Sequence, residues 1–506
     1  MCFVARVTRT ITMVSHVVAD AFRLASTSLN GRFISPYQNR GVVWMLNAEI
    51  GRDSGPLGGF LCDEMGLGKT VQMTGTMLGN PVKRTLVIVP RSVVSQWVSE
   101  LNKFAPQLSV QVWEGKDVPL TADVVVTTYG RVMNRKDFEK YTLLHKYSWD
   151  RVVLDEAHEI RNAKSKTHKS VCALKCKYRW ILTGTPVFNN LRDFVSLCSF
   201  FGIEQRMVQA KYRSICDEHV LRRTKEDVSK FNSRLALPGC DIENVELEMY
   251  DEEEAIYSVA YEETRDMIME IFRTSTNIAA HAMNILEGLL RVRQCMVHPQ
   301  LYLDGVALKT DANVEFYEGK SKKFEYLLDG IKSHPTEKSL VFSQFRTEMD
   351  MIGKMLRDEG ITCYRIDGSV PGHIRDKFVQ DFKNFDGGCV FLIQIKAGGV
   401  GLNLQEATRV YITAPSWNPA TELQAIGRSH RTGQTKQVFV KKLIYVGSND
   451  IPSIEQSMLD LQFRKSGISA EVLGDETLKK QIPFTNMKNV SIRDIKKLFS
   501  APPKKS

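Results

Sequence analysis

The sequence contains no apolar run of the roughly 18–20 residues that a membrane-spanning helix requires, so we expect no membrane partner. Its ten cysteines are scattered, without a CxxC repeat or zinc-finger spacing. The only suggestive groupings are Cys172 with Cys176 and Cys216 with His219, so reduced, buried thiols in a reducing compartment are expected rather than zinc. No internal repeat of solenoid length is present either.

The bulk composition is that of a globular protein with more than one domain. The chain has 506 residues, of which 43% are hydrophobic and 25% are charged. Its formal net charge is +10 and its sequence pI is about 9.0. This surplus favours a polyanionic partner but does not identify one, because solubility alone could also explain it.

Two regions alternate short Val/Ile/Leu strands with amphipathic helices. Apolar runs of four to six residues, separated by helices, indicate parallel sheets covered on both faces. We therefore predict an α/β protein with two doubly wound parallel-sheet lobes. The expected strands are 59–62, 85–89, 124–128, 151–154 and 180–183 in the first region, and 339–342, 362–366, 390–394, 409–412 and 438–445 in the second.

The remaining segments differ in composition. Residues 250–300 are acidic and then helix-rich, and the last forty residues are basic and typical of a frayed end, with a short helix expected at 492–499. The first residues contain Arg6 and Arg9 but no clean apolar core or cleavage site, which argues against a targeting peptide. The predicted organisation is an N-terminal extension at 1–33, a first lobe at 34–200, helical insertions and a linker at 201–320, a second lobe at 321–465 and a basic tail at 466–506.

The most informative motif is the glycine-rich turn DEMGLGKT at 63–70, which follows a hydrophobic run and opens a helical pattern. Glycines let successive backbone N–H groups point at phosphate oxygens, and the helix N-terminus adds its positive end. Lys69 can reach the β- and γ-phosphates, and the Thr70 hydroxyl can bind magnesium. The full consensus has glycine at the position of Asp63, so taken alone the turn could also be an ordinary strand–turn–helix junction.

A second motif, Asp155-Glu156-Ala157-His158, follows an aliphatic strand. Carboxylates at the carboxyl end of a parallel strand would face the nucleotide crevice. Asp155 would hold magnesium, directly or through water, and Glu156 would polarise the attacking water. His158 would sense the nucleotide.

Two further turns follow predicted strands. The LTGTP turn at 182–186 carries small hydroxylated residues that suit coupling better than chemistry, although a capped turn before a helix is an alternative. The KAGGVGLNL turn at 396–404 could offer backbone N–H groups to nucleic-acid phosphates or to the nucleotide, and alone it could equally be a tight strand–helix junction.

The segment QAIGRSHRTGQ at 424–434 contains Arg428 and Arg431, which are three residues apart and would share one face if the segment is helical. Guanidinium groups aimed at the γ-phosphate would neutralise charge in the transition state, as arginine fingers do. A surface helix with two solvated arginines is the alternative.

In this order, the segments resemble superfamily-two helicase-like ATPases, and more narrowly the SWI/SNF-type DNA-dependent translocases, over about residues 34–462. The long KAGGVGLNL and RQCMVHPQL blocks look closest to the repair-associated branch of that family. The further matching blocks are PYQ at 36–38, LVIVPRSVVSQWVSEL at 86–101, VVTTYG at 125–130, LRRTKEDV at 221–228, RQCMVHPQL at 293–301, LVFSQF at 340–345, YRIDGS at 364–369 and SWNPATELQAIGRSHRTGQ at 416–434.

The resemblance implies two RecA-like lobes that bind ATP and Mg²⁺ and step along duplex DNA, remodelling or evicting DNA-bound proteins such as nucleosomes, usually without strand separation. Gln38 would contact adenine. The nucleotide would also be bound by Asp63, Glu64, Met65, Gly66, Leu67, Gly68, Lys69 and Thr70, with Gly401, Arg428 and Arg431 from the second lobe. Coupling would involve His158, Thr183, Gly184, Thr185 and Gln424. The DNA would be contacted by Thr128, Lys396, Gly398, Gly399 and Trp417.

Two alternatives remain: a DEAH-type RNA helicase, which the LTGTP and WNP blocks disfavour, and a DNA-binding scaffold that does not hydrolyse ATP. We expect a nuclear location, or a cytoplasmic replication site if the chain is encoded by a virus.

Overall fold

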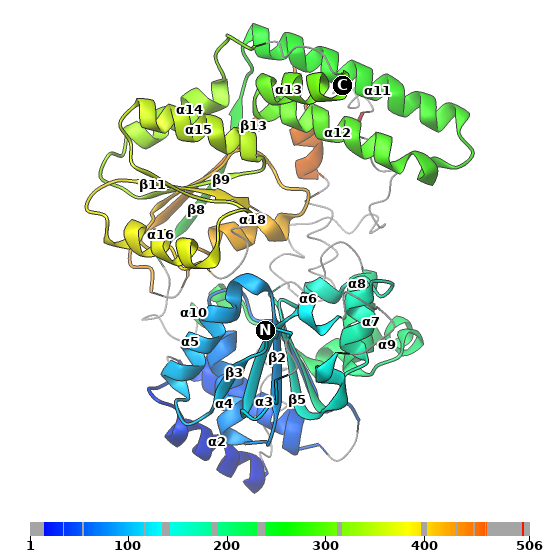
Figure 1. Cartoon of the computed structure of the whole chain (residues 1–506), viewed down its shortest axis with the longest axis vertical. Coiled ribbons are helices and arrows are strands. Elements are labelled where there is room, and N and C mark those ends of the chain that lie inside the picture. Colours follow the sequence, from blue (N-terminus) through cyan, green and yellow to red (C-terminus); the bar gives the residue numbers. More distant parts are fainter. Residues whose placement is uncertain are drawn as a thin grey trace. The chain divides into compact units, whose positions relative to one another are not determined.

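A computed structural model describes residues 15–33, 35–52, 55–115, 118–133, 142–184, 191–229, 238–310, 316–395, 402–431, 433–448, 451–460, 462, 498 and 499. These residues belong to two compact units, one made of the described residues up to 229 and the other of those from 238 onward (Figure 1).

The first unit is built on a seven-stranded sheet in the order β3-β4-β2-β5-β6-β1-β7, and every recorded strand pair is parallel. Alternate residues of its central strands face opposite sides, and both sides are buried, as expected for parallel strands covered by helices. The strands are β1 (Gly58–Leu61), β2 (Thr85–Val89), β3 (Val110–Val112), β4 (Val124–Thr128), β5 (Ser148–Asp155), β6 (Lys175–Leu182) and β7 (Val220–Leu221).

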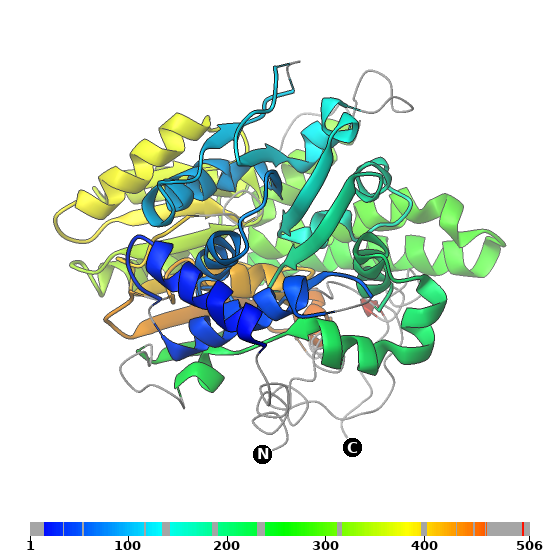
Figure 2. The same cartoon turned by 90° about the horizontal axis from the view of Figure 1, so that it is seen from below.

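Helices cover this sheet. Helices α8 and α9 pack with the strands in one hydrophobic cluster that contains Phe60, Ile88 and Leu154. Helices α2 and α3 form a small cluster of their own around Val18 and Leu46, and they appear as neighbouring blue helices in Figure 2. The described helices are α2 (His16–Ser28), α3 (Pro36–Ile50), α4 (Lys69–Gly79), α5 (Val94–Phe104), α6 (Tyr129–Val132), α7 (Lys166–Cys172), α8 (Leu191–Phe201), α9 (Gln205–His219) and α10 (Lys225–Ser229), with 3₁₀ turns at Arg91–Val93, Leu143–Lys146 and Ala157–Ile160.

The second unit has a six-stranded sheet in the order β10-β11-β9-β12-β13-β8, again with parallel pairs. One face packs against α16 and α18, and the other against α12, α14 and α15. The strands are β8 (Cys240–Leu247), β9 (Ser339–Ser343), β10 (Cys363–Ile366), β11 (Val390–Gln394), β12 (Arg409–Ile412) and β13 (Val438–Tyr445). The helices are α11 (Asp251–Thr274), α12 (Ala282–Val297), α13 (Pro299–Thr310), α14 (Lys322–Lys332), α15 (Arg346–Asp358), α16 (Gly372–Asn384) and α18 (Pro419–Ile426), with a 3₁₀ turn at Ile278–His281.

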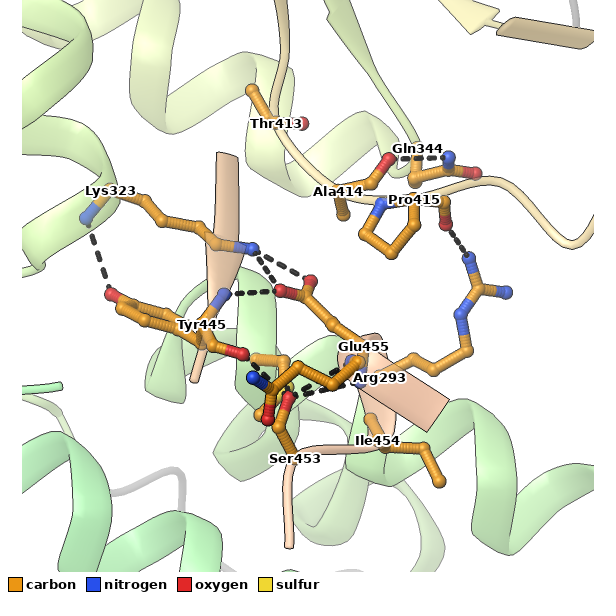
Figure 3. A network of polar contacts seen from close by, with 12 residues as sticks. Arg293, Lys323, Gln344, Thr413, Ala414, Pro415, Tyr445, Ser453, Ile454 and Glu455 are labelled. Carbon is orange, nitrogen blue, oxygen red and sulfur yellow. Dashed lines mark hydrogen bonds and ion pairs between the residues drawn. The ribbon is translucent and has the colours of Figure 1, made fainter. Parts of the chain in front are cut away.

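A buried ion pair joins distant segments of the second unit (Figure 3). The Nζ atom of Lys323, at the start of α14, lies 2.7 Å from Oε1 of Glu455, and both side chains are almost fully buried. The Tyr445 N–H at the end of β13 donates to Glu455 Oε2 at 2.8 Å. Glu455 therefore ties the last strand of this sheet to α14.

The predicted fold class, with two doubly wound parallel sheets, is confirmed. All ten expected strands are present. The region 201–320, expected to be helical insertions and linker, differs at two places: β7 pairs with β1 in the first sheet, and β8 pairs with β13 in the second. The predicted domain boundaries themselves stay predictions, and of the predicted helix at 492–499 only Leu498 and Phe499 lie within the described residues, where both are buried against the second unit's core.

Within the described parts of the chain, none of the helices is both long and apolar enough to cross a membrane. The nine cysteines found there are all free thiols. Burial raises the pKa of Cys62 and of Cys216 to about 12, which makes these two thiols poor nucleophiles at neutral pH.

The buried imidazole of His298, which follows α12, makes the second unit sensitive to acid. Its ring packs 4.9 Å from the Phe324 ring, its Nδ1 accepts a hydrogen bond from Gln300 N, and burial lowers its pKa to about 4. The unfolded chain binds a proton near pH 6.5 and the folded chain does not, so stability falls as the pH drops through this window. We expect this group to lower the unfolding free energy by about 2 kcal/mol between about pH 7 and about pH 5.

The substitution His298→Asn keeps an acceptor near the Nδ1 position but cannot titrate. Urea unfolding at the two pH values should therefore show a smaller acid-induced loss in this variant, by about 2 kcal/mol. His373→Asn, which changes an exposed imidazole, is the matched control and should keep the wild-type slope. An unchanged slope in His298→Asn would show that this imidazole is not the acid-sensitive group.

Candidate active site

The glycine-rich turn lies between β1 and α4, at the carboxyl end of a parallel strand. Gly66 and Gly68 have φ angles of +88° and +75°, a region that side-chain-bearing residues rarely adopt, and α4 begins immediately afterwards at Lys69. The backbone therefore curls around the N-terminus of α4, where N–H groups lack partners within the helix. Thr70 lies in the first turn of that helix. This geometry suits an anion such as a phosphate.

Lys69 and Asp63 differ in this turn in the contacts and the burial of their side chains. The half-buried Lys69 Nζ donates to the backbone oxygen of Asp63 at 2.8 Å, so the ammonium group lies directly over the turn. The Asp63 carboxylate is fully buried, and it accepts hydrogen bonds from Arg223 Nε at 2.9 Å and from Gln72 Nε2 at 3.1 Å. The Asp63 side chain therefore holds the turn in place, and its backbone oxygen faces the lysine.

The predicted adenine contact lies against the same turn. Gln38, in the first helical turn of α3, is only 2% exposed. A Cβ atom placed on Gly68 would lie 2.5 Å from Gln38 Nε2, so the absence of a side chain at Gly68 allows this close approach. The neighbouring Tyr37 hydroxyl donates to Leu67 O at 2.9 Å. Gln38 thus lies in the same local region as Glu64, Met65 and Leu67. Residues 62–70, which are the glycine-rich turn and the residue before it, are called the cradle.

Asp155 and Glu156 form a turn at the end of β5. Glu156 has φ +48° and is the sole non-glycine residue with positive φ among the described residues. Asp155 Oδ1 accepts a hydrogen bond from the Glu156 N–H at 3.0 Å, and His158 Nδ1 lies 3.5 Å from Glu156 Oε2. Burial and the neighbouring Glu156 raise the pKa of Asp155 to about 6, while the Trp97 hydrogen bond and Lys69 partly oppose this rise.

The first part of the LTGTP turn lies beside the cradle. Thr183 is fully buried, and its N–H donates to Leu61 O, at the end of β1, at 3.2 Å. A Cβ atom on Gly184 would lie 3.3 Å from Met65 Cγ and 3.9 Å from Lys69 Nζ. The predicted coupling residue Thr185 lies outside the described residues.

No role was predicted for Arg222 and Arg223 of the LRRTKEDV block, yet both bind the cradle. Arg222 Nη1 donates to Cys62 O at 2.9 Å and to Gly184 O at 3.0 Å. Arg223 forms an ion pair with Asp63 and also donates to the Tyr37 carbonyl. The sequence offered no local signal for these arginines, because the strand before them has only two residues and the buried carboxylate of Asp63, which requires a cationic partner, is apparent only in the structure.

The residues present fit magnesium and a nucleoside triphosphate. Two adjacent carboxylates with restricted access to water make the protonated form of Asp155 more favourable, and a divalent cation would relieve that repulsion. Asp155 and the Thr70 hydroxyl offer the oxygen ligands that Mg²⁺ prefers. The curled backbone and Lys69 offer donors and positive charge for phosphates.

In the second unit, Arg428 and Arg431 lie outside any helix, so the condition under which they would share a helical face is not met. Helix α18 ends at Ile426, with Gly427 as its C-cap, and both arginines lie in the turns that follow. Arg428 is only 4% exposed, and its carbonyl accepts a hydrogen bond from Leu404 N at 3.0 Å, which links this turn to the last residue of the KAGGVGLNL block. The predicted coupling residue Gln424 is buried on α18.

Three side chains bind the backbone of the segment before α18, and Figure 3 shows two of them, Arg293 and Gln344. Arg293 of α12 donates to Pro415 O at 3.2 Å, and Gln344 donates to Ala414 O at 3.3 Å. The Ser416 N–H donates to a carboxylate oxygen of Glu422 at 2.7 Å. These bonds fix the approach of the chain to the WNP turn.

Two of the predicted DNA contacts can be placed within their own units. Thr128 ends β4 and is 9% exposed. Trp417 precedes α18 and is partly buried against the core of the second unit, so only part of its ring is accessible. The predicted contacts Lys396, Gly398 and Gly399, and the predicted nucleotide contact Gly401, lie outside the described residues.

A model of the SNF2-related domain matches residues 37–301, and a model of the helicase conserved C-terminal domain matches residues 322–433. The tetrapeptide DEAH at 155–158 thus lies within an SNF2-related domain, and the predicted DEAH-box classification is not supported.

Similar proteins come from viruses and from cells. A "Probable global transactivator" of Orgyia pseudotsugata multicapsid polyhedrosis virus is 29% identical over 491 residues, covering 92% of this chain and 94% of the relative. DNA repair protein RAD5B of Arabidopsis thaliana is 28% identical, covering 83% of this chain and 46% of the relative. The mouse SWI/SNF-related matrix-associated actin-dependent regulator of chromatin subfamily A member 1 is 29% identical, covering 88% and 44%.

The chain therefore spans nearly all of the viral relative but less than half of each of these two cellular ones. A solved Sulfolobus solfataricus SWI2/SNF2 ATPase core in complex with dsDNA is 28% identical, with coverage of 91% of this chain and 98% of that one and a TM-score of 0.39. Because the SNF2-related model alone matches more than half of the 506 residues, the chain belongs to the SNF2-related family of helicase-like, DNA-dependent ATPases.

Proposed function

We propose that this chain is an ATP-dependent translocase on double-stranded DNA that remodels or displaces DNA-bound proteins without separating the strands. The observation that carries the proposal is the gathering of Lys69, Gly184 and the Asp155–Glu156 turn around the N-terminus of α4, in a chain of the SNF2-related family. These groups come from three separate sequence motifs, and together they suit phosphoryl transfer.

Each group has a proposed role in hydrolysis. Lys69 and the cradle N–H groups bind the β- and γ-phosphates, and Gln38 contacts adenine. Asp155 and Thr70 hold Mg²⁺, which would neutralise charge on the phosphates when bound. Glu156 orients the attacking water and takes up its proton. Arg428 and Arg431 are proposed to stabilise the charge on the γ-phosphate.

Arg222 suits a role in coupling. Its guanidinium bridges the cradle carbonyl of Cys62 and the LTGTP carbonyl of Gly184, so a shift of the cradle would be passed directly to the turn that follows β6. Thr183, Gly184 and His158 are proposed to take part in the same coupling. Because neither turn can move alone without breaking one of these two bonds, a change at the phosphates would extend beyond the cradle.

The proposed partner is duplex DNA, with nucleosomes or other DNA-bound proteins as targets. The net charge of +10 favours a polyanion. The names of two relatives refer to DNA repair and to chromatin. We propose a nuclear location, or a cytoplasmic replication site if the chain is viral, and the relatives include proteins from both sources.

ATP turnover measured without nucleic acid and with duplex DNA, single-stranded DNA or RNA tests the proposal. Duplex DNA should stimulate turnover most, and Lys69→Ala should abolish turnover while leaving DNA binding largely intact. Affinity for duplex should fall by roughly 10³-fold between about 50 and about 200 mM salt if about six phosphates are contacted. Stimulation by RNA alone would indicate an RNA helicase, and no turnover under any condition would indicate a scaffold.

Translocation and strand separation are distinguished by two substrates. A translocase should displace a third strand from a triplex when ATP is present, and it should leave a forked duplex paired. Lys69→Ala is the control for both substrates. Unwinding of the fork would contradict translocation without strand separation.

A further inference from the structure

The Asp155–Glu156 turn has a strained backbone. Glu156 has φ +48° and ψ +50°, the left-handed region that is unfavourable for a residue with a side chain. Such a conformation persists only when the surrounding structure holds it from several sides. Part of the support is local, because the Glu156 N–H donates to Asp155 Oδ1 at 3.0 Å. Two aromatic residues from other elements, for which no role was predicted, also hold this turn.

The first is Trp97, on α5. Its side chain is 1% exposed, and its indole Nε1–H donates to Asp155 Oδ2 at 2.7 Å. An indole has a single donor and no acceptor, so in this buried position the hydrogen bond defines which way the carboxylate turns. With Glu156 N on Oδ1 and Trp97 on Oδ2, both carboxylate oxygens of Asp155 are oriented by fixed donors.

The second is Tyr129, the first residue of α6. Its side chain is 4% exposed, and its hydroxyl donates to the backbone oxygen of Asp155 at 2.8 Å. That carbonyl belongs to the peptide that leads directly into Glu156, so its orientation is linked to the ψ angle of Asp155 and to the direction in which Glu156 leaves the strand. Trp97 and Tyr129 therefore hold the same turn at its side chain and at its backbone.

We propose that Trp97 and Tyr129 are positioning residues for ATP hydrolysis, which hold the strained Asp155–Glu156 turn in the arrangement that binds magnesium and orients water. This inference rests on the proposed function only for the roles of Asp155 and Glu156. Substituting a group that orients a metal ligand through a hydrogen bond commonly lowers metal affinity or activity by roughly 10- to 100-fold. Neither aromatic residue needs to touch the nucleotide for this effect.

The main test is Trp97→Phe, which keeps a buried ring and removes the N–H donor. Binding of a fluorescent ATP analogue is measured with excess Mg²⁺ and again with EDTA. We expect the Mg²⁺-dependent gain in affinity to fall roughly 10- to 100-fold, with the affinity in EDTA unchanged. The matched control is Trp149→Phe, because Trp149 is 2% exposed and donates to Leu144 O at 2.9 Å elsewhere in the same unit.

A second variant keeps the inference testable if Trp97→Phe does not fold. Tyr129→Phe removes one hydroxyl, and we expect kcat to fall roughly 10-fold with little change in KM, because the turn is displaced while the cradle is intact. Tyr257→Phe is the control, since its buried hydroxyl also donates to a backbone carbonyl at 2.8 Å, in the second unit.

The outcomes separate this inference from the proposed function. If Trp97→Phe weakens nucleotide binding equally with Mg²⁺ and with EDTA, or behaves like Trp149→Phe, Trp97 does not position a magnesium ligand. If Tyr129→Phe keeps the wild-type kcat, the hydrogen bond from Tyr129 to the Asp155 carbonyl does not position the turn for hydrolysis. If the wild-type protein binds Mg²⁺-nucleotide but is not stimulated by duplex DNA, the proposed function fails, and the binding experiment still decides the roles of the two aromatic residues.

Discussion

Replacing Glu156 with glutamine should lower kcat for ATP hydrolysis by roughly 10²- to 10⁴-fold while ATP still binds. The amide has nearly the same size and shape as the carboxylate, but it cannot accept a proton from the attacking water. Glu156 is partly buried at the end of β5, next to the proposed magnesium ligand Asp155. Single-turnover hydrolysis and nucleotide binding, measured on the same preparation, would separate the chemical step from affinity.

Glu159→Gln is the matched control, because it makes the same change three residues later at an exposed position of the following 3₁₀ turn. It should leave kcat close to that of the wild type. If Glu156→Gln retained kcat within a factor of about three, Glu156 could not be the general base and another residue would have to activate the water.

Replacing Arg151 with methionine should lower the unfolding free energy of the first unit by about 3–5 kcal/mol. Arg151 of β5 and Glu49 of α3 form a fully buried pair, with Nε to Oε1 and Nη2 to Oε2 each 2.6 Å apart. Glu49 also accepts hydrogen bonds from Trp180 Nε1 and from Asn80 Nδ2, each at 2.7 Å. Without the guanidinium, the Glu49 carboxylate would remain buried with no counter-charge.

Two controls accompany this prediction. In the double variant Glu49→Gln/Arg151→Met no buried charge remains and the introduced amide still offers an acceptor to Trp180, so part of the lost stability should return. Arg23→Met breaks an exposed pair with Asp20 and should change stability by less than about 0.5 kcal/mol. Urea unfolding followed by tryptophan fluorescence measures all three. Equal midpoints for Arg151→Met and Arg23→Met would show that the buried pair does not support the unit.

The strands that are buried on both faces could be predicted. The Thr85–Val89 strand and the Val390–Gln394 strand are continuous apolar runs, because helices cover both sides of a parallel sheet. Strand β8 could not be found in this way. It lies at the edge of its sheet, and only Val245 and Leu247 are buried, so its sequence contains no apolar run. The strand β7 has only two residues, which is too short for any periodicity.

In the candidate site, too, some residues could be predicted from the sequence and others could not. The motifs predicted Gln38, Lys69, Asp155 and Gly184 as site residues. The structure brings these residues of the first unit close to the turn before α4. Their roles in catalysis stay predictions. The supporting residues were not predicted, because Trp97 acts only through a contact with a residue far away in sequence. A local pattern cannot show such a contact, whereas a glycine-rich turn shows its own geometry.

The ends of helices were also hard to predict. Arg428 and Arg431 have helical spacing, yet Gly427 ends α18 before either of them. Once the chain leaves the helix, a separation of three residues no longer implies a shared face. A Gly-x-Ser sequence after a periodic segment was the available signal for a helix stop.

The pairing of β8 with β13 has a consequence for how the protein is made. Cys240–Leu247 lies alongside Val438–Tyr445 through eight consecutive partners, so the first strand of this sheet to be synthesised is completed by the last. On the ribosome, every other strand of the sheet emerges before that neighbour exists, and long-range pairings of this kind form slowly. Until then both β8 and β12 expose backbone donors and acceptors that another nascent chain could pair with. Protection by a chaperone is thus most needed while the segment between residues 247 and 438 is being translated.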